Sequence, residues 1–244
     1  MTNKQFSINL VKKAGAVIRK NFAMGMKKEW KSDSSPVTAT DIAINKMVIE
    51  AVKKQYPKHN VLGEEESYRS NNSKFLWVCD PVDGTVPFSH GIPTCVFSLA
   101  LVFDGRPILG VIYDPFMDRI FFAELGKGAT LNGRRIRVNK LNLSRGVIGW
   151  SNIRVAEMRK KFPNVANICL WCICYEGVLV ASGELQATYF GGFTAHDIAA
   201  LKVIVEEAGG KVTDKFGKEQ RYDRAINGAL ISNGIVHKEL LKMV

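Results

Sequence analysis

The sequence predicts a layered protein of the α+β (mixed α/β) class, and two observations support this. Segments with helical spacing of apolar residues interleave along the chain with short apolar runs that are typical of strands. Asp104-Gly105 and Asn132-Gly133 lie between such runs, where these dipeptides favour tight antiparallel turns. Because a purely parallel sheet would lack hairpins, the pattern favours a mixed architecture over a Rossmann sheet.

Two helices open the chain, and a series of strands follows. Apolar side chains from Phe6 to Phe22 share one helical face, which predicts a helix over residues 4–24. A second helix begins near Thr40-Asp41 and ends before Pro57, since proline lacks the N–H that a helix interior requires. The predicted strands of this half are 61–62, 75–79, 94–103, 108–113 and 119–124.

The second half of the chain alternates strands with two further helices. Helices are expected over residues 174–182 and 197–208, and Gly209-Gly210 ends the latter because glycine suits the residue after a helix. We expect one domain over residues 1–244, with two subdomains at roughly 1–142 and 143–244. The remaining strands are predicted at 147–150, 211–213 and 229–232.

Composition and length are typical of a globular protein that stays in the cytoplasm. Of the 244 residues, 46% are hydrophobic and 23% are charged, and no apolar run is long enough to span a bilayer. Charges interrupt the N-terminal segment, which predicts a packed helix rather than a signal peptide. Five cysteines, an odd number, argue against a disulfide framework. We interpret Cys169, Cys172 and Cys174 as core thiols rather than zinc ligands.

The formal net charge of +11 raises the alternative of a nucleic-acid-associated protein. The basic clusters are spread along the chain, however, and no nucleic-acid-binding module signature accompanies them. A basic surface that attracts small anionic substrates explains the same charge. We therefore expect no nucleic-acid partner and no membrane partner, and salt-sensitive gel shifts would test the first expectation.

An oxygen-rich motif, Asp80-Pro81-Val82-Asp83-Gly84-Thr85, follows the apolar run 75–79. It gathers two carboxylates, a backbone carbonyl and a hydroxyl at the end of a predicted buried strand. Hard divalent cations prefer such oxygen ligands, and backbone N–H groups beside them suit a phosphate. The alternative is a hairpin turn, which Asp-Gly after a strand also favours.

Further carboxylates stand at other element boundaries. Asp41 and Asp197 lie at predicted helix starts, and Glu64-Glu65 follows a strand. Each has a structural alternative, as an N-cap for the aspartates and as a solvated turn for the glutamates. Taken together, carboxylates at strand ends can converge in one crevice. Oxygen ligands without paired histidines or cysteines favour Mg²⁺ or Mn²⁺ over zinc.

In their order and spacing, these motifs resemble the inositol monophosphatase family of Mg²⁺-dependent, lithium-sensitive phosphatases. The similarity extends from about Ser35 to Asp214. The resemblance implies a layered α-β-α-β-α sandwich of the sugar and inositol phosphatase type, a homodimer, and hydrolysis without a covalent intermediate. The segments that carry it are Thr38-Ala39-Thr40-Asp41, Gly63-Glu64-Glu65, the motif from Asp80 to Thr85, Gly126-Lys127-Gly128-Ala129, Asp197-Ile198-Ala199-Ala200 and Glu206-Glu207-Ala208-Gly209-Gly210.

The resemblance also implies which residues hold the metal ions. By matched position, Glu64, Asp80 and the backbone carbonyl of Val82 would hold one ion. Asp80, Asp83 and Asp197 would hold a second ion. The implied cofactor is Mg²⁺, with two or three ions, and Mn²⁺ is an alternative.

Other matched residues are implied to act on water and phosphate. Glu65 would lie near a third, weaker metal site, and Thr85 paired with Asp41 would orient and deprotonate the attacking water. Thr85 followed by Pro87 favours a helix N-terminus, because proline suits the first helical turn. The backbone N–H groups of Gly84 and Thr85 would then face the substrate phosphate.

Several positions depart from the family pattern, among them Val86-Pro87, which replaces a more usual polar pair before Phe88. Trp171-Cys172-Ile173 stands where family members often carry Gly-Ser-Ala, and Phe190 replaces an acidic residue that is typical of inositol-phosphate binders. His196 replaces a tryptophan; it is a packing replacement, or it contacts substrate or tunes Asp197. These departures predict a bulkier, more apolar substrate pocket around Cys172, Ile173, Phe190 and His196.

We hypothesise a Mg²⁺-dependent phosphomonoesterase that hydrolyses a small polyol or sugar phosphate by attack of metal-activated water. Alternatives within the superfamily are a fructose-1,6-bisphosphatase, a histidinol-phosphatase and a 3′-phosphonucleotide phosphatase. The alternative from another class is a catalytically silent binder of phosphate or metal. Thr85 and Asp41 argue against that alternative, since a pure binder needs no pair that activates water.

Overall fold

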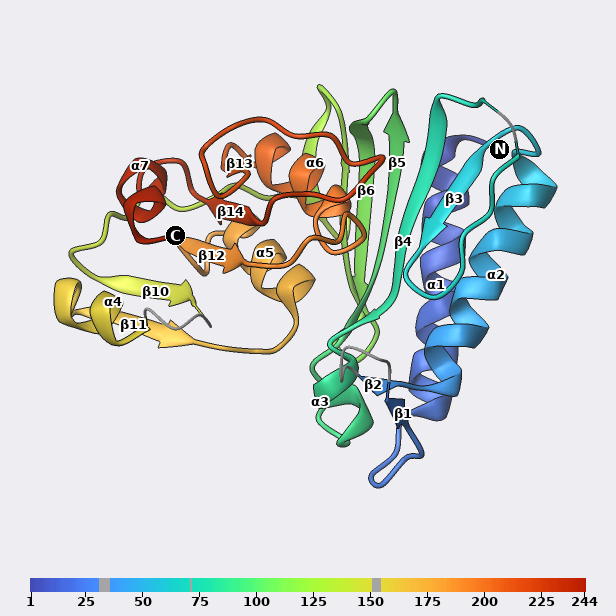
Figure 1. Ribbon diagram of the computed structural model, residues 1–244, viewed down its shortest axis with the longest axis horizontal. Coiled ribbons are helices and arrows are strands. Elements are labelled where there is room, and N and C mark those ends of the chain that lie inside the picture. The colour runs from blue at the N-terminus through green and yellow to red at the C-terminus, as the bar shows by residue number, and fades with distance from the viewer. Residues whose placement is uncertain (31–35, 71, 151–154) are drawn as a thin grey trace.

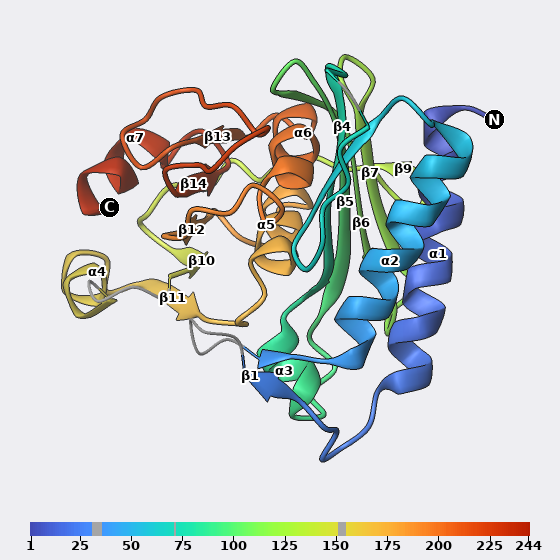
Figure 2. The ribbon, with the colours of Figure 1, turned by 45° about the vertical axis from the view of Figure 1, so that its right-hand side comes forward.

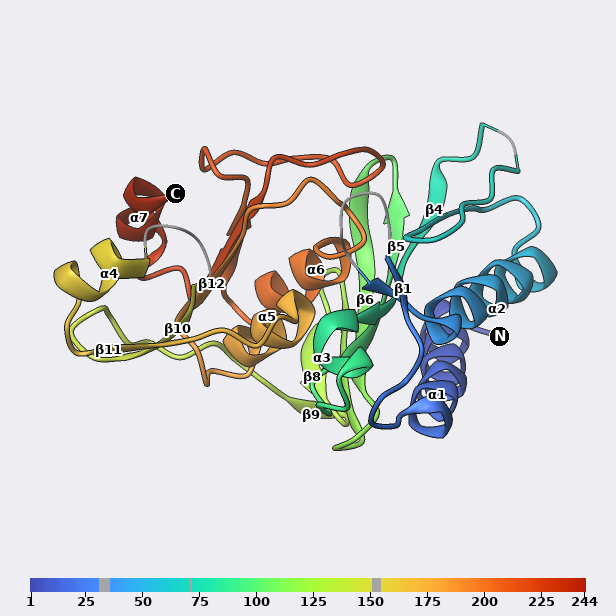
Figure 3. The same cartoon turned by 60° about the horizontal axis from the view of Figure 1, so that its bottom comes forward.

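The computed structural model describes residues 1–30, 36–70, 72–150 and 155–244. Its helices and sheets stack in five layers, α-β-α-β-α, which confirms the predicted architecture (Figure 1). One helical layer covers the outer face of a seven-stranded sheet. Two helices fill the space between that sheet and a five-stranded sheet, and two short helices lie on the far side of the latter (Figure 3).

The outer helical layer consists of α1 (Asn3–Asn21) and α2 (Ala39–Gln55), which lie side by side (Figure 2). Phe6, Leu10 and Ala14 are buried along one face of α1, at the spacing that places residues above one another on a helix. This face packs on the seven-stranded sheet. Among the described residues, no helix is both long enough and apolar enough to cross a membrane.

The seven-stranded sheet has the order β3-β4-β5-β6-β7-β8-β9. The β3–β4 pair is parallel and the other pairs are antiparallel. Asp104 and Gly105 have φ values of 49° and 80° and form the predicted turn between β5 and β6. The strands are β3 (Asn60–Gly63), β4 (Phe75–Asp83), β5 (Val96–Phe103), β6 (Arg106–Asp114), β7 (Arg119–Glu124), β8 (Gly128–Leu131) and β9 (Arg134–Arg135).

The five-stranded sheet has the order β11-β10-β12-β14-β13 and mixes parallel with antiparallel pairs. Its strands are β10 (Gly146–Gly149), β11 (Val165–Ile168), β12 (Ala187–Phe190), β13 (Lys211–Thr213) and β14 (Ala229–Ser232). The remaining elements are the central helices α5 (Ile173–Ala181) and α6 (Ala199–Glu207), the far helices α4 (Val155–Lys161) and α7 (His237–Leu240), the 3₁₀ turn Leu241–Met243, the short helix α3 (Thr85–Ser89), and the paired strands β1 (Glu29–Trp30) and β2 (Pro36–Val37).

Strand β5 is buried on both faces, which explains why its sequence is a continuous apolar run. Phe97 and Leu99 belong to the core beneath α1 and α2, whereas Ala100 and Val102 belong to the core around α5 and α6. Successive side chains of a strand point to opposite faces, so one strand contributes to both cores. A third core lies between the five-stranded sheet and the helices α4 and α7.

The central helix α6 lies directly against the seven-stranded sheet at Gly110 of β6. A Cβ atom on Gly110 would come within 2.5 Å of the carbonyl oxygen of Ala200, in the first turn of α6. The missing side chain therefore permits close approach of the two backbones. As a result, the start of α6 is held against the middle of the sheet.

The structure confirms the predicted helices and the predicted strands, with ends that differ by a few residues. Strand β4 is the clearest difference, because it continues past the apolar run 75–79 through Asp83. Four elements of the second half were not predicted: α4, β11, β12 and α7. Each is seven residues or fewer, which is too short to display a helical or strand period in the sequence.

Candidate active site

Two carboxylates are presented by an irregularity in strand β4. Asp80 pairs with Ser98 of β5 and Asp83 pairs with Val96, so β4 contains one residue more than β5 between these pairs. Such a β-bulge breaks the usual alternation of side chains. Val82 donates its backbone N–H to Asp80 Oδ1 at 3.0 Å within the bulge. The side chains of Asp80 and Asp83, which lie three positions apart in β4, are thereby brought close enough to bind the same cation.

The motif then turns from strand to helix at Gly84. Gly84 has φ 92°, and a Cβ atom there would lie 2.6 Å from the carbonyl oxygen of Thr94. Both features require glycine. The next residue, Thr85, begins α3. The alternative of a hairpin turn is therefore wrong, because the Asp-Gly dipeptide leads into a helix.

Thr85 and Asp41 are in contact, as the family resemblance implied. Thr85 Oγ1 lies 3.2 Å from Asp41 Oδ1 and 2.9 Å from the carbonyl oxygen of Val82. Asp41 is not the N-cap of α2; Thr38 is, and Asp41 completes a capping box by accepting the Thr38 backbone N–H at 2.9 Å. The carboxylate is therefore fixed by the helix start and still reaches Thr85. Burial raises the pKa of Asp41 to about 6.

The loop after β3 carries Glu64 and Glu65. The Glu64 backbone N–H donates to the carbonyl oxygen of Cys79, and the Glu65 N–H donates to Asn45 Oδ1 at 3.3 Å. Asn45 on α2 also donates to the carbonyl oxygen of Glu66 at 2.8 Å. Sequence analysis did not identify Asn45, because a single asparagine within a helix has no distinguishing pattern. It joins the loop to the helix that carries Asp41.

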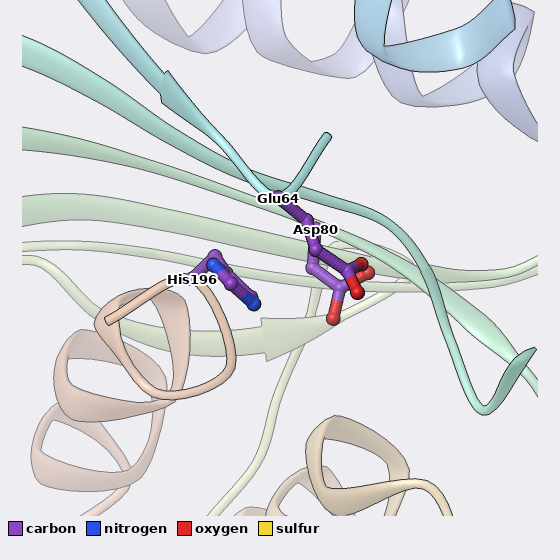
Figure 4. Close-up of side chains that lie close together, drawn as sticks. All are labelled: Glu64, Asp80 and His196. Atoms are coloured by element: carbon purple, nitrogen blue, oxygen red, sulfur yellow. The ribbon is translucent and has the colours of Figure 1, made fainter. Parts of the chain in front are cut away.

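Carboxylates and one histidine form three overlapping groups, and each group is compact enough to bind one cation. Within each group, one ligand atom from every member lies within 4.8 Å of the others. Asp197, which precedes α6, reaches the same crevice from the central helical layer. The groups are Asp41, Glu64 and Glu65; Asp80, Asp83 and Asp197; and Glu64, Asp80 and His196 (Figure 4).

The buried, mutually repelling carboxylates of this crevice would be stabilised by a bound cation. Burial, followed by the charges of Glu64, Asp83 and Asp197, raises the pKa of Asp80 well above its usual value. Burial and then Asp197 raise the pKa of Asp83 to about 7. Buried carboxylates that repel one another are stabilised when a cation lies between them. The donor set, rich in carboxylate oxygens, fits a hard divalent ion.

Asp83 is held by the segment that precedes α5. The Cys174 backbone N–H donates to Asp83 Oδ2 at 2.6 Å, and the Cys172 thiol donates to the same oxygen at 3.0 Å. Both cysteines are buried, as predicted, but Cys169 is exposed, so its interpretation as a core thiol is wrong. Cys169 lies in the segment between β11 and α5, where the side chain remains at the surface.

A pocket of about 270 Å³ opens beside Asp83 and Asp197. The predicted residues Cys172, Ile173 and Phe190 line it, whereas His196 is not among its lining residues. Its other lining residues are Cys169, Trp171, Glu176, Tyr189, Gly191 and Gly192. Apolar side chains therefore form much of the wall, in agreement with the departures from the family pattern.

Glu176 is a buried pocket residue that sequence analysis missed. Its carboxylate accepts the Leu170 backbone N–H at 2.8 Å and the Thr188 hydroxyl at 2.6 Å. Burial raises the pKa of Glu176. These bonds join the segment before α5 to strand β12, so Glu176 fixes the pocket wall. A single glutamate in an apolar helical segment gave no signal of this contact.

The layered fold and the acidic crevice together define a metal-dependent phosphatase. A model of the inositol monophosphatase family matches residues 3–244, and the chain belongs to that family of phosphatases.

Characterised relatives and solved structures cover nearly the whole chain. The "Fructose-1,6-bisphosphatase/inositol-1-monophosphatase" of Thermotoga maritima is 31% identical over 100% of this chain and 96% of its own length. "Inositol monophosphatase 1" of Solanum lycopersicum is 32% identical over 87% of this chain and 84% of its own length. The structure of a Thermotoga maritima IMPase has a TM-score of 0.90 at 31% identity, covering 99% of this chain and 96% of that one.

Proposed function

We propose that this protein is a Mg²⁺-dependent phosphomonoesterase that hydrolyses a small polyol or sugar phosphate. The observation that carries the proposal is the crevice in which Asp80, Asp83 and Asp197 converge beside the hydrogen-bonded pair Thr85 and Asp41. A carboxylate cluster alone would suit a metal binder. A hydroxyl bonded to a carboxylate beside it suits an enzyme that must orient water and remove its proton.

The proposed ligands divide into two sets. Glu64, Asp80 and the Val82 carbonyl would hold one Mg²⁺ ion, and Asp80, Asp83 and Asp197 would hold a second. When bound, the ions would polarise the phosphoryl group and stabilise charge on the departing oxygen.

The chain's own groups would position the water and the phosphate. The Thr85 hydroxyl, 3.2 Å from Asp41, would orient the attacking water, accept a proton from it and donate its own hydroxyl proton to the Asp41 carboxylate. Glu65, near Asp41 and Glu64, would support a third, weaker metal site. The backbone N–H groups of Gly84 and Thr85 would bind the phosphate oxygens.

The substrate's alcohol part would occupy the pocket beside Asp83. Trp171, Ile173 and Phe190 give the wall an apolar character, and Glu176 is its buried carboxylate. This wall would favour a polyol or sugar that presents a hydrocarbon face over a fully hydroxylated ring such as inositol. The Thermotoga relative, whose name includes fructose-1,6-bisphosphatase, makes a sugar bisphosphate the second candidate substrate.

Several further properties belong to the same proposal. The protein would be inhibited by Li⁺, act in the cytoplasm as a homodimer, and bind neither nucleic acid nor membrane. Its two subdomains would divide near residue 142, since the seven-stranded sheet contains strands before this point and the five-stranded sheet contains strands after it.

Phosphate release from a panel of small phosphomonoesters tests the proposal. The panel contains inositol 1-phosphate, fructose 1,6-bisphosphate, histidinol phosphate, a 3′-phosphonucleotide and an aromatic phosphate, with and without Mg²⁺ and Li⁺. We expect Mg²⁺-dependent, Li⁺-sensitive release from at least one ester. Absence of release from all of them, in protein that binds Mg²⁺, would favour the catalytically silent binder.

A further inference from the structure

A histidine lies among the carboxylates of the candidate active site. His196 immediately precedes Asp197, and its side chain is 13% exposed. One ring nitrogen, one Glu64 oxygen and one Asp80 oxygen lie within 4.8 Å of one another. Figure 4 shows the imidazole facing the two carboxylates from the opposite side of the crevice. Its Nε2 is also 3.5 Å from Asp197 Oδ2.

The three side chains come from separate parts of the fold. Glu64 lies in the loop after β3, Asp80 lies in β4, and His196 lies in the turn before α6. Three ligand atoms that surround one ion at about 2.1 Å are about 3.0–3.6 Å apart. Atoms at the observed limit of 4.8 Å would therefore each move inward by about 1 Å to enclose an ion, which side-chain rotations provide.

The chemistry of this set differs from that of the carboxylate groups. Mg²⁺ takes oxygen ligands and retains much of its water, whereas imidazole nitrogen suits first-row transition metals. Replacing one oxygen ligand by an imidazole therefore shifts preference away from Mg²⁺. Packing alone does not account for a ring nitrogen directed at two carboxylates of the proposed Mg²⁺ site.

We propose that His196 is a metal ligand, and that with Glu64 and Asp80 it forms a site selective for a divalent transition-metal ion over Mg²⁺. The inference rests on the proposed function, because Glu64 and Asp80 also belong to the proposed Mg²⁺ site. The same nitrogen and oxygen ligands would bind Mn²⁺, Co²⁺ or Zn²⁺. The bound ion would retain open positions for water or a phosphate oxygen.

Pulsed electron paramagnetic resonance of bound Mn²⁺ tests the proposal without measuring turnover. We expect nitrogen modulation of the Mn²⁺ echo in the wild-type protein, with a change to the ¹⁵N pattern when the protein is labelled with ¹⁵N-histidine. His90→Gln is the matched control, since His90 is an exposed histidine that contacts Lys28. That variant should retain the signal. Bound Mn²⁺ without histidine modulation, or no Mn²⁺ binding at all, would overturn the proposal.

The metal affinities of a His196 variant show whether His196 is a metal ligand or a structural residue. His196→Phe should weaken Mn²⁺ and Co²⁺ binding by about tenfold or more, while Mg²⁺ affinity should change by less than about threefold. Equal losses for all three ions would assign His196 a structural role and overturn the proposal. If the variant fails to fold, the ¹⁵N-labelled wild-type protein still decides. Hydrolysis with Mg²⁺ in protein that lacks the nitrogen signal would leave the proposed function intact and refute this inference.

Discussion

The two sides of the candidate active site are built in different ways. On the side of the seven-stranded sheet, buried backbone fixes each carboxylate: a capping box holds Asp41 and a bulge holds Asp80. On the pocket side, Trp171 is 70% exposed and has φ 54°, and Phe190 is half-buried at the end of β12. From this comparison we infer that the first side would set the chemistry, whereas the second side would set the substrate preference. Substitutions on each side test this division.

The largest effect is expected from Asp83→Asn on the carboxylate side. The change removes the negative charge of a proposed ligand of the second ion, so kcat should fall by about a thousandfold or more and divalent binding should weaken. Steady-state kinetics and isothermal titration with Mg²⁺ measure both. Glu50→Gln, which neutralises an exposed residue of α2, is the control and should leave both unchanged. Activity within a few-fold of wild type would contradict the ligand assignment.

Thr85→Ala should lower kcat by about 10²–10³-fold, because it removes the hydroxyl that contacts Asp41. Mg²⁺ affinity should remain within about threefold, since the hydroxyl is not a proposed ligand. Thr85→Ser, which retains the hydroxyl, should recover most of the activity. If Thr85→Ala weakens metal binding as much as turnover, the residue is structural.

A histidine far from the crevice should make stability depend on pH. His237 Nδ1 lies 2.8 Å from Ser232 Oγ and its Nε2 lies 2.9 Å from Thr213 Oγ1. Burial, then the charges of Lys211 and Lys202, lower its pKa from 6.5 to about 4. Because the folded state favours neutral imidazole, this contribution is complete above pH 6.5 and is lost as pH falls toward about 4.

Urea unfolding from pH 7 to pH 4 measures this dependence. The wild-type protein should lose stability across the window, and His237→Gln should lose less. Turnover at pH 7 should be similar in both proteins, because the histidine begins α7 and contacts β13 and β14 rather than the crevice. Identical slopes would show that other groups cause the acid sensitivity.

The smallest effect is expected from Trp171→Gly on the pocket side. Glycine relieves a left-handed conformation, which costs a non-glycine residue about 1 kcal/mol, so stability should be equal or slightly greater. The ratio of kcat/KM between aromatic and polyol phosphates should change by about tenfold. Phe216→Ala, at another exposed aromatic residue outside the pocket, is the control. An unchanged ratio would show that Trp171 does not affect the preference between these substrates.

The sequence predicted most of the carboxylate side because its information is local. The motif from Asp80 to Thr85 places oxygen donors and a helix start within six residues, but its bulge was not predicted because the apolar run ends at residue 79. The proximity of Asp83 and Asp197 required a family resemblance, since they lie 114 positions apart and no periodicity connects them. The orientation of His196 toward Glu64 could not be predicted, because it depends on how the turn before α6 packs on the sheet.

The close approach at Gly110 has a consequence for the accuracy of the metal site. Asp197 lies at the start of α6, whereas Asp80 and Asp83 lie in the sheet, so the spacing between helix and strand determines the distance between ligands. A methyl group at Gly110 would meet Ala200 and displace the start of α6. Misplacement by about 1 Å can reduce catalysis by about a hundredfold. Gly110, which is not a proposed ligand or pocket residue, thus helps to set the distance of Asp197 from Asp80 and Asp83.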